Sequence, residues 1–216
     1  SNAFASGSNT RNEKGFYFSN AISIAANWRL VNSIDFYSND FFKNTCHSPS
    51  HGYEFDSQLN YTPNKNTSML IGFRNKQKMK NTSHSDLYQR HLILEKSNMI
   101  RFHITYDITE DICLKNRVEY HFNYQEEEKY NSYLIYQDVL YNPPDKTYNI
   151  SLRYELFNAE KGSVYAYEND VLYAFAVGGL SGKGVRTYLV GKVKLLNHIQ
   201  FSSKIGFTFY DDKNEI

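Results

Sequence analysis

Strict alternation of apolar and polar residues is the feature of this sequence that most restricts its fold. Between residues 100 and 108, Ile, Phe and Tyr alternate with Arg, His, Thr and Asp, and the pattern restarts after the polar segment 109–111. It recurs in 148–156 and, with one slip, in 199–209. Because successive side chains of a β-strand point to opposite faces, each segment has one apolar and one charged face. The sequence therefore predicts an all-β protein.

The same rule, applied along the whole chain, predicts about twelve strands. Turn-forming residues separate several of them, as in Pro63–Asn66, Asn142–Asp145 and the glycine-rich 178–184. Short connections favour hairpins over crossovers, so we expect an antiparallel up-and-down meander, closed or nearly closed into a barrel of the outer-membrane type. The predicted strands span residues 16–25, 28–37, 53–61, 68–78, 88–96, 99–108, 112–124, 131–141, 147–157, 164–177, 185–196 and 199–210.

Length and composition fit one such domain. The chain has 216 residues, and β-barrels reach about 200–250 residues as a single unit. Ser1–Ala3 resembles an expression-tag remnant, which leaves 4–216 as a single β-barrel domain. The net charge of +1 comes from 24 basic and 23 acidic residues in mixed order. Since no basic stripe is visible, we do not expect this segment to bind nucleic acid.

Alternation alone leaves open whether the apolar face meets lipid or a dry core. Three observations favour lipid. The predicted strands are close to the roughly 9–11 residues that cross a bilayer at a tilt. A twelve-stranded barrel is too wide for side chains to fill its interior. Aromatic residues mark the ends of apolar runs, as an aromatic girdle requires; these are Phe16, Tyr53, Tyr61, Tyr106, Tyr124, Tyr148 and Phe209.

If the apolar face meets lipid, the polar face lines the lumen of the barrel. A lining of mixed charge holds plugs or tunes permeation through paired charges. We therefore expect lumen-facing positions on three of the predicted strands. The residues are Arg101, His103, Asp107, Lys115, Arg117, Glu119, His121, Arg153 and Glu155.

Catalytic and metal sites have weak support. Cys46, His47 and His51 place three soft ligands in one loop, but the spacing is not a standard zinc pattern and no fourth ligand is visible. Some outer-membrane lipid hydrolases carry a Ser two residues after a strand-borne His, where this chain has Thr105 and Asn123. Without a nucleophile–base pair we expect no enzyme and no cofactor, with an envelope hydrolase as a minor alternative.

The C-terminal half resembles a known family. The segments Phe157–Glu160, Val164–Tyr173 and Gly182–Leu189 are similar to a recurrent segment of the large helix-hairpin-helix (DNA-uptake-like) proteins of Bacteroidetes. Asn12–Tyr17 and Tyr136–Val139 continue the likeness more loosely. The resemblance implies an outer-membrane β-barrel region that follows helix-hairpin-helix repeats. The family-like positions are Tyr165, Tyr167, Glu168, Asn169, Asp170, Gly184, Arg186 and Tyr188.

Two departures from that family limit what carries over. The chain has no helix-hairpin-helix segment, and it ends at Asp211–Ile216 without the terminal aromatic strand of an outer-membrane barrel. We therefore expect a fragment of a longer protein, with strand edges that favour homo-oligomers.

The predicted function follows from these expectations. It is a membrane-embedded segment of a cell-envelope protein that contacts lipid in the outer membrane and acts as an anchor, a pore or a translocation partner. The alternative is a soluble, periplasmic β-barrel or sandwich that binds an apolar ligand or a partner protein.

Overall fold

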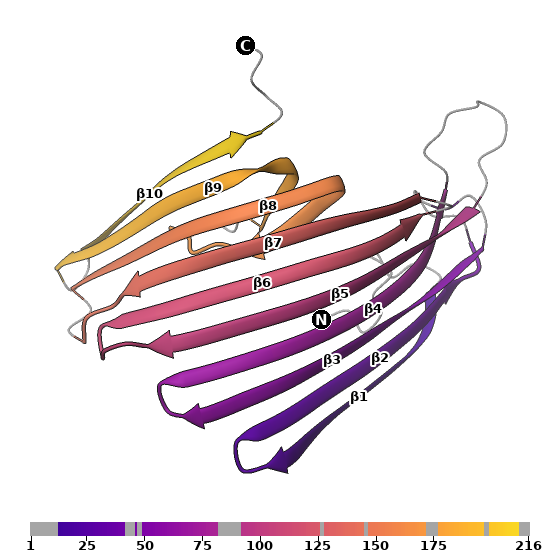
Figure 1. Cartoon of the computed structure of the whole chain (residues 1–216), viewed down its shortest axis with the longest axis horizontal. Coiled ribbons are helices and arrows are strands. Elements are labelled where there is room, and N and C mark those ends of the chain that lie inside the picture. The colour runs from indigo at the N-terminus through magenta and orange to yellow at the C-terminus, as the bar shows by residue number, and fades with distance from the viewer. Residues whose placement is uncertain are drawn as a thin grey trace. The chain divides into compact units, whose positions relative to one another are not determined.

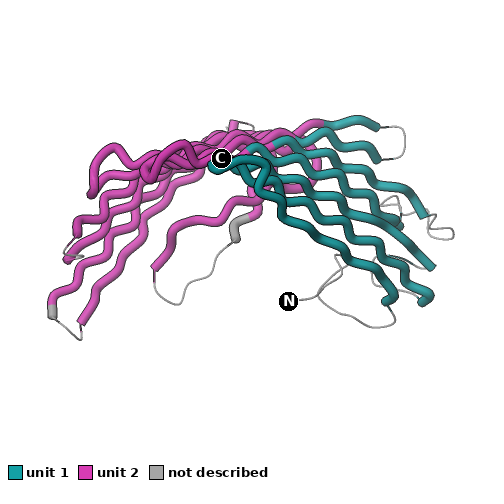
Figure 2. The backbone as a smooth tube through the Cα atoms, turned by 90° about the horizontal axis from the view of Figure 1, so that it is seen from below, with its two compact units in different colours: residues 1–60, 71–100, 121–130 teal, residues 61–70, 101–120, 131–216 magenta. Residues whose placement is uncertain are grey.

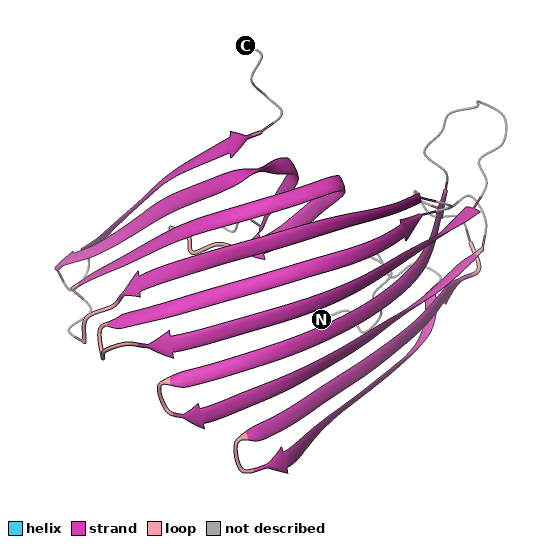
Figure 3. Cartoon of the chain, viewed as in Figure 1, coloured by secondary structure: helices cyan, strands magenta, loops and turns pink. Residues whose placement is uncertain are grey.

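The computed structural model describes residues 13–41, 46, 49–81, 92–125, 128–144, 147–171, 177–196 and 199–211. Its regular elements are ten β-strands (Figure 1, Figure 3). Within these residues no helix is long and apolar enough to cross a membrane. The strands are β1 (Glu13–Ala25), β2 (Trp28–Asn39), β3 (Ser50–Asn64), β4 (Thr67–Asn81), β5 (Leu92–Asp107), β6 (Ile112–Gln125), β7 (Glu128–Tyr141), β8 (Tyr148–Tyr167), β9 (Val177–Leu196) and β10 (Ile199–Tyr210).

All ten strands belong to one sheet, in which each strand pairs with its neighbours in sequence. The pairing is antiparallel, as in the registers Asp138↔Arg153 between β7 and β8 and Arg153↔Tyr188 between β8 and β9. The predicted all-β antiparallel meander is therefore confirmed. In this strand order β1 and β10 are the two edges, so the described sheet is not closed into a barrel.

Ten strands replace the predicted twelve, because two pairs of predicted strands are each continuous. Strand β5 runs through Ser97 and Asn98, and the Asn98 side chain accepts a hydrogen bond from Asn75 of the neighbouring strand at 2.5 Å. Strand β8 continues through residues 160–163, which form a bulge where the register with β9 shifts. Residues 97–98 and 160–163, which the sequence pattern predicts as turns, therefore belong to continuous strands. The glycine-rich segment 178–184 also lies within a strand, β9, and not in a loop.

The chain divides into two compact units, coloured separately in Figure 2. Unit 1 comprises residues 1–60, 71–100 and 121–130, and unit 2 comprises residues 61–70, 101–120 and 131–216. Unit 2 holds an apolar cluster of Leu134, Tyr136, Phe157, Ala159, Val164, Ala166 and Leu180.

Candidate functional site

Burial in unit 2 is the inverse of that in a water-soluble sheet. On β8, Leu152 and Tyr154 are 44% and 54% exposed. Arg153, which lies between them, and Glu155, which follows Tyr154, are only 2% and 1% exposed. On β7, Asp138 is likewise buried. In a soluble protein charged side chains face the solvent and apolar ones fill the core. Here the charged face is covered and the apolar face is open.

The exposed apolar face is not confined to one strand. In unit 2 its members on β5 to β10 are Phe102, Tyr106, Val118, Ile135, Val139, Tyr148, Ile150, Leu152, Tyr154, Leu189, Val193, Leu195, Ile199, Phe201, Ile205, Phe207 and Phe209. Unit 1 has the same character, with buried Asp35 and Asn39 and exposed Phe16, Phe18, Ile22, Ile24, Phe36, Ile71 and Phe73. Contiguous apolar surface of this extent marks a protein or membrane contact.

Arg153 is the centre of the buried polar face of unit 2. Its Nε and Nη2 atoms donate to the two carboxylate oxygens of Asp138 at 2.5 and 2.7 Å, and its Nη1 donates to Glu155 at 3.3 Å. The guanidinium lies 3.8 Å from the ring centroid of Tyr136 and 5.4 Å from that of Tyr188. A buried charge is tolerated when it is paired and hydrogen-bonded, and Arg153 is bound by two carboxylates. Among the described residues, Glu155 Oε1 has no hydrogen-bond partner.

The ends of β8 and β9 form a hairpin that folds back over this polar face, and we call Val164–Asp170 together with Val177–Leu180 the folded-back hairpin. In Figure 1 both ribbons bend round at one end. The bend lies at the β8 bulge, where Gly162 and Gly182 have φ angles of +83° and +77°. Glycine adopts this left-handed conformation without the steric cost that other residues incur.

Apolar packing attaches the hairpin to the strands beneath it. Val164 and Ala166 of β8 and Leu180 of β9 are all buried. They pack in one cluster with Leu134 and Tyr136 of β7 and with the earlier part of β8. Burial of an apolar side chain stabilises the folded state by about 0.8 kcal/mol per methylene. The cluster therefore stabilises the hairpin in its folded-back position.

Backbone groups of the hairpin also bond to the polar face. The Tyr167 carbonyl accepts a hydrogen bond from Arg153 Nη1 at 2.9 Å, although the two residues are 14 positions apart on the same strand. A straight strand would separate them by roughly 46 Å at its usual rise per residue. The Asn169 N–H donates to the Tyr188 hydroxyl at 2.9 Å. These bonds require the hairpin to fold back.

Two carboxylates beyond the end of β8 meet two cations of β9 and β10. Glu168 accepts hydrogen bonds from Arg186 at 2.6 and 3.0 Å and from Lys204 at 2.8 Å. Asp170 accepts from Lys204 at 2.9 Å. Desolvation acts to raise the pKa of both carboxyl groups, but the hydrogen bonds outweigh it, and both pKa values are lowered. The carboxylates are therefore held in the charged form.

The structure brings most of the family-like residues together. Glu168, Asn169, Asp170, Arg186 and Tyr188 all take part in the contacts between hairpin and sheet. Gly184 lies where a Cβ atom would collide with the Phe209 carbonyl and touch the Phe157 ring at 3.0 Å. Tyr165 and Tyr167 are exposed side chains, at 58% and 78%.

The other predicted lumen residues, on β5 and β6, are buried or half-buried. Arg101 and Glu119 form an ion pair at 2.6 Å, and Asp107 is half-buried on the same strand as Arg101. His103, Lys115 and Arg117 are half-buried on β5 and β6, whereas the half-buried His121 belongs to unit 1.

The predicted site residues omit Tyr136, Asp138 and Lys204, which are central to the polar face. Asp138 shares its face of β7 with Leu134, Tyr136 and Leu140, all buried. No clean alternation therefore marks that face as polar. Lys204 reads as polar in the sequence, but its partners lie 34 and 36 residues away.

The weak metal candidate does not assemble a ligand set in the described residues. Cys46 is buried and its Sγ donates to the Met79 carbonyl at 3.0 Å. His47 lies outside the described residues. Throughout the described part of the chain, no group of three or more His, Cys, Asp or Glu side chains is placed to hold a metal ion.

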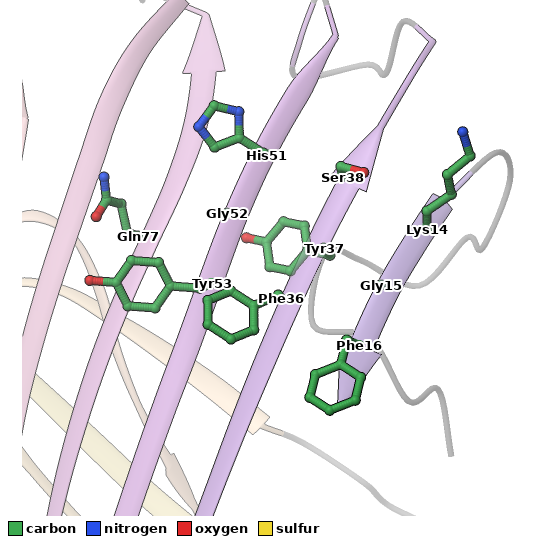
Figure 4. Close-up of a pocket in the computed structure, with 10 residues that line it drawn as sticks. All are labelled: Lys14, Gly15, Phe16, Phe36, Tyr37, Ser38, His51, Gly52, Tyr53 and Gln77. Atoms are coloured by element: carbon green, nitrogen blue, oxygen red, sulfur yellow. The ribbon is translucent and has the colours of Figure 1, made fainter. Parts of the chain in front are cut away.

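Unit 1 contains a shallow cavity of about 570 Å³. Figure 4 shows aromatic rings along it, and the Phe36 and Tyr53 rings are 6.0 Å apart. Among the described residues, no carboxylate lines this cavity. The lining residues are Lys14, Gly15, Phe16, Phe36, Tyr37, Ser38, His51, Gly52, Tyr53 and Gln77.

Comparison with known proteins yields no family model, no curated protein and no solved structure that matches this chain. The resemblance to the helix-hairpin-helix proteins stays a prediction.

Proposed function

We propose that this chain is a membrane-embedded β-barrel segment of a cell-envelope protein, placed in the outer membrane. Its apolar face contacts lipid, and its charged face is turned to the barrel interior, where the folded-back hairpin covers part of it. The observation that carries the proposal is the inverted burial, in which Arg153 and Glu155 are 2% and 1% exposed while Leu152 and Tyr154 beside them are open. A transmembrane β-barrel alternates in this way, with apolar side chains outside and polar ones inside.

A water-soluble alternative has an energetic cost. Each exposed apolar side chain would forgo about 25 cal/mol per Å² of surface that burial stabilises, and the exposed set spans every strand from β5 to β10 in unit 2. In lipid that cost is absent. The exposed Phe16, Tyr106, Tyr124, Tyr148 and Phe209 then form part of the aromatic girdle at the membrane boundary.

The folded-back hairpin favours passage of a solute or partner segment over simple anchoring. A bare anchor has no use for a hairpin whose carboxylates are fixed to Arg186 and Lys204 on the polar face. A hairpin in that position narrows the interior of a barrel. We assign it the role of an internal constriction.

The edge strands β1 and β10 set a requirement for this proposal. An unpaired strand edge leaves backbone N–H and C=O groups without partners, and hydrocarbon offers none. In the membrane both edges therefore pair with further strands and complete the barrel. A homo-oligomer through these edges is one way to satisfy them. The family resemblance, which stays a prediction, agrees with a barrel region of a larger envelope protein.

Solution behaviour tests the proposal. The protein is purified without detergent, and its far-UV circular dichroism and light scattering are recorded before and after detergent is added. The proposal predicts a β spectrum with aggregation that detergent reverses. A monodisperse β protein that needs no detergent would contradict it and would favour the soluble alternative with a ligand or protein partner.

A further inference from the structure

Among the described residues, two buried nitrogen atoms on the polar face of unit 2 have no hydrogen-bond partner. They are Nε of Arg117 and Nδ1 of His103. The other ring nitrogen of the histidine, Nε2, is 3.3 Å from the Thr105 hydroxyl. When that hydroxyl donates to Nε2, the ring proton is on Nδ1, which becomes a donor. Buried donors without an acceptor are rare in folded proteins and call for an explanation.

The two donors lie on neighbouring strands at opposed positions. Two contacts give the register of the β5–β6 hairpin. They are the Arg101–Glu119 ion pair and the hydrogen bond from the Ile108 N–H to the Ile112 carbonyl. In both contacts the two residue numbers have the same sum. An antiparallel register keeps that sum constant, so His103 is opposite Arg117. The charges of Arg117, Lys115 and Arg101 all act on the His103 ring.

The surrounding carboxylates are already engaged. Glu119 is bound by Arg101 at 2.6 Å, and Asp138 is bound twice by Arg153. Within the described residues, Lys115 and Arg117 form no ion pair. The Arg117 guanidinium lies 5.3 Å from the Tyr136 ring centroid, a cation–π contact that fixes its position.

We propose that His103, Lys115 and Arg117 form a binding site for a small oxyanion, a carboxylate or a phosphate. One oxygen accepts from Arg117 Nε and another from His103 Nδ1, while the Lys115 ammonium adds charge. Hydrogen bonds to an ionised acceptor are stronger and shorter than neutral ones. The site itself does not depend on membrane insertion. In the proposed barrel it lies on the lumen face and retains anionic solutes.

Titration of the detergent-solubilised protein with inorganic phosphate and with acetate tests the site, because it measures binding whether or not the membrane proposal holds. Heat of binding gives the affinity, and the ring ¹⁵N signals of His103 report the location. We expect saturable binding that moves the Nδ1 signal. Arg117→Gln and Lys115→Gln should each weaken binding by about tenfold or more, the effect of losing one charge-assisted contact.

Arg74→Gln is the matched control, since that arginine is already paired with Glu54 and Asp56 in unit 1. It should leave phosphate affinity unchanged. Lys115, which is half-buried and makes no ion pair in the described residues, provides the safer variant if Arg117→Gln does not fold. No saturable binding, or equal affinity in Lys115→Gln and Arg74→Gln, would overturn the proposal. A short-chain phosphatidic acid that binds more tightly than both free anions would reassign the site to a lipid headgroup and overturn the solute assignment.

Discussion

Arg186 of β9 and Glu168 of the folded-back hairpin form two parallel hydrogen bonds, Nε to Oε1 at 2.6 Å and Nη2 to Oε2 at 3.0 Å. This fork geometry is the strongest arrangement available to an arginine and a carboxylate. The Glu168 side chain is only 4% exposed. The pair therefore fixes the hairpin to the sheet at a position that water screens little.

Glu168→Gln should loosen the hairpin while leaving the sheet folded. The substitution leaves Arg186 and Lys204 without their shared anion, and breaking a buried pair costs about 3–5 kcal/mol. We expect faster amide hydrogen exchange at residues 164–171 and unchanged exchange in β7. Lys183→Gln is the control because the Lys183–Asp211 pair is half exposed on both sides. Its removal should cost less than about 1 kcal/mol. Equal exchange in both variants would show that the hairpin does not depend on Glu168.

Acid should release the hairpin. The pKa values of Glu168 and Asp170 are lowered in the folded protein by hydrogen bonds that outweigh desolvation. Groups with a depressed folded pKa contribute stability above their unfolded pKa and lose it as pH falls through the folded pKa. The hairpin should thus stay closed at neutral pH and open below the ordinary carboxyl range. The amide NMR signal of Asn169, whose N–H donates to Tyr188, reports the change. A pH-independent signal down to the unfolding of the sheet would refute this.

The bend of the hairpin should be sensitive to a single methyl group at Gly162. That residue has a φ of +83°, and a Cβ added there would meet no atom within 4 Å. The cost of Gly162→Ala is therefore conformational, about 1–2 kcal/mol for a left-handed residue. Gly191→Ala is the matched control, since its Cβ also meets nothing within 4 Å and its φ is not positive. Chemical denaturation in detergent measures both. Equal losses of stability in Gly162→Ala and Gly191→Ala would mean that the bend does not require glycine at position 162.

Removing one partner of the Arg153–Asp138 pair should lower the free energy of unfolding more than replacing both partners with neutral residues. Arg153→Gln leaves the Asp138 carboxylate buried without its cation, and we expect a loss of about 3–5 kcal/mol. Asp138→Asn should cost a similar amount. Because the double variant has no unpaired charge between these two positions, its loss should be well below the sum of the single losses. A double-mutant cycle in denaturant measures this coupling, and strict additivity would contradict it.

On strands with clean alternation, such as β8, the sequence predicts the two faces well, because alternation is a local property. Leu152 and Tyr154 alternate with Arg153 and Glu155, and the structure keeps that division. Strand number is harder to predict. Turn-like residues at 97–98 and 160–163 remain in strands, since cross-strand partners and a bulge accommodate them. Those partners are distant in sequence and leave no local signal.

The folded-back hairpin could not be derived from alternation. Its glycines, which permit the bend, resemble those of an ordinary loop in the sequence. The contacts of Glu168 connect it to Arg186 and Lys204, which are 18 and 36 residues away. The resemblance to a family singled out this segment, yet the contacts that hold it in place emerge only when β8, β9 and β10 are aligned in the sheet.

Cysteine labelling along β8 tests most directly whether the apolar face contacts lipid. In a background with Cys46 and Cys113 replaced by Ser, single cysteines are placed at Asn149, Ile150, Ser151 and Leu152, which alternate between half-buried and exposed positions. Each is labelled with a fluorophore, and the protein is reconstituted in vesicles that contain a quencher attached to the lipid chains. We predict strong quenching at 150 and 152 and weak quenching at 149 and 151. Equal quenching at all four positions, or strong quenching at 149 and 151 alone, would contradict a lipid-facing apolar surface.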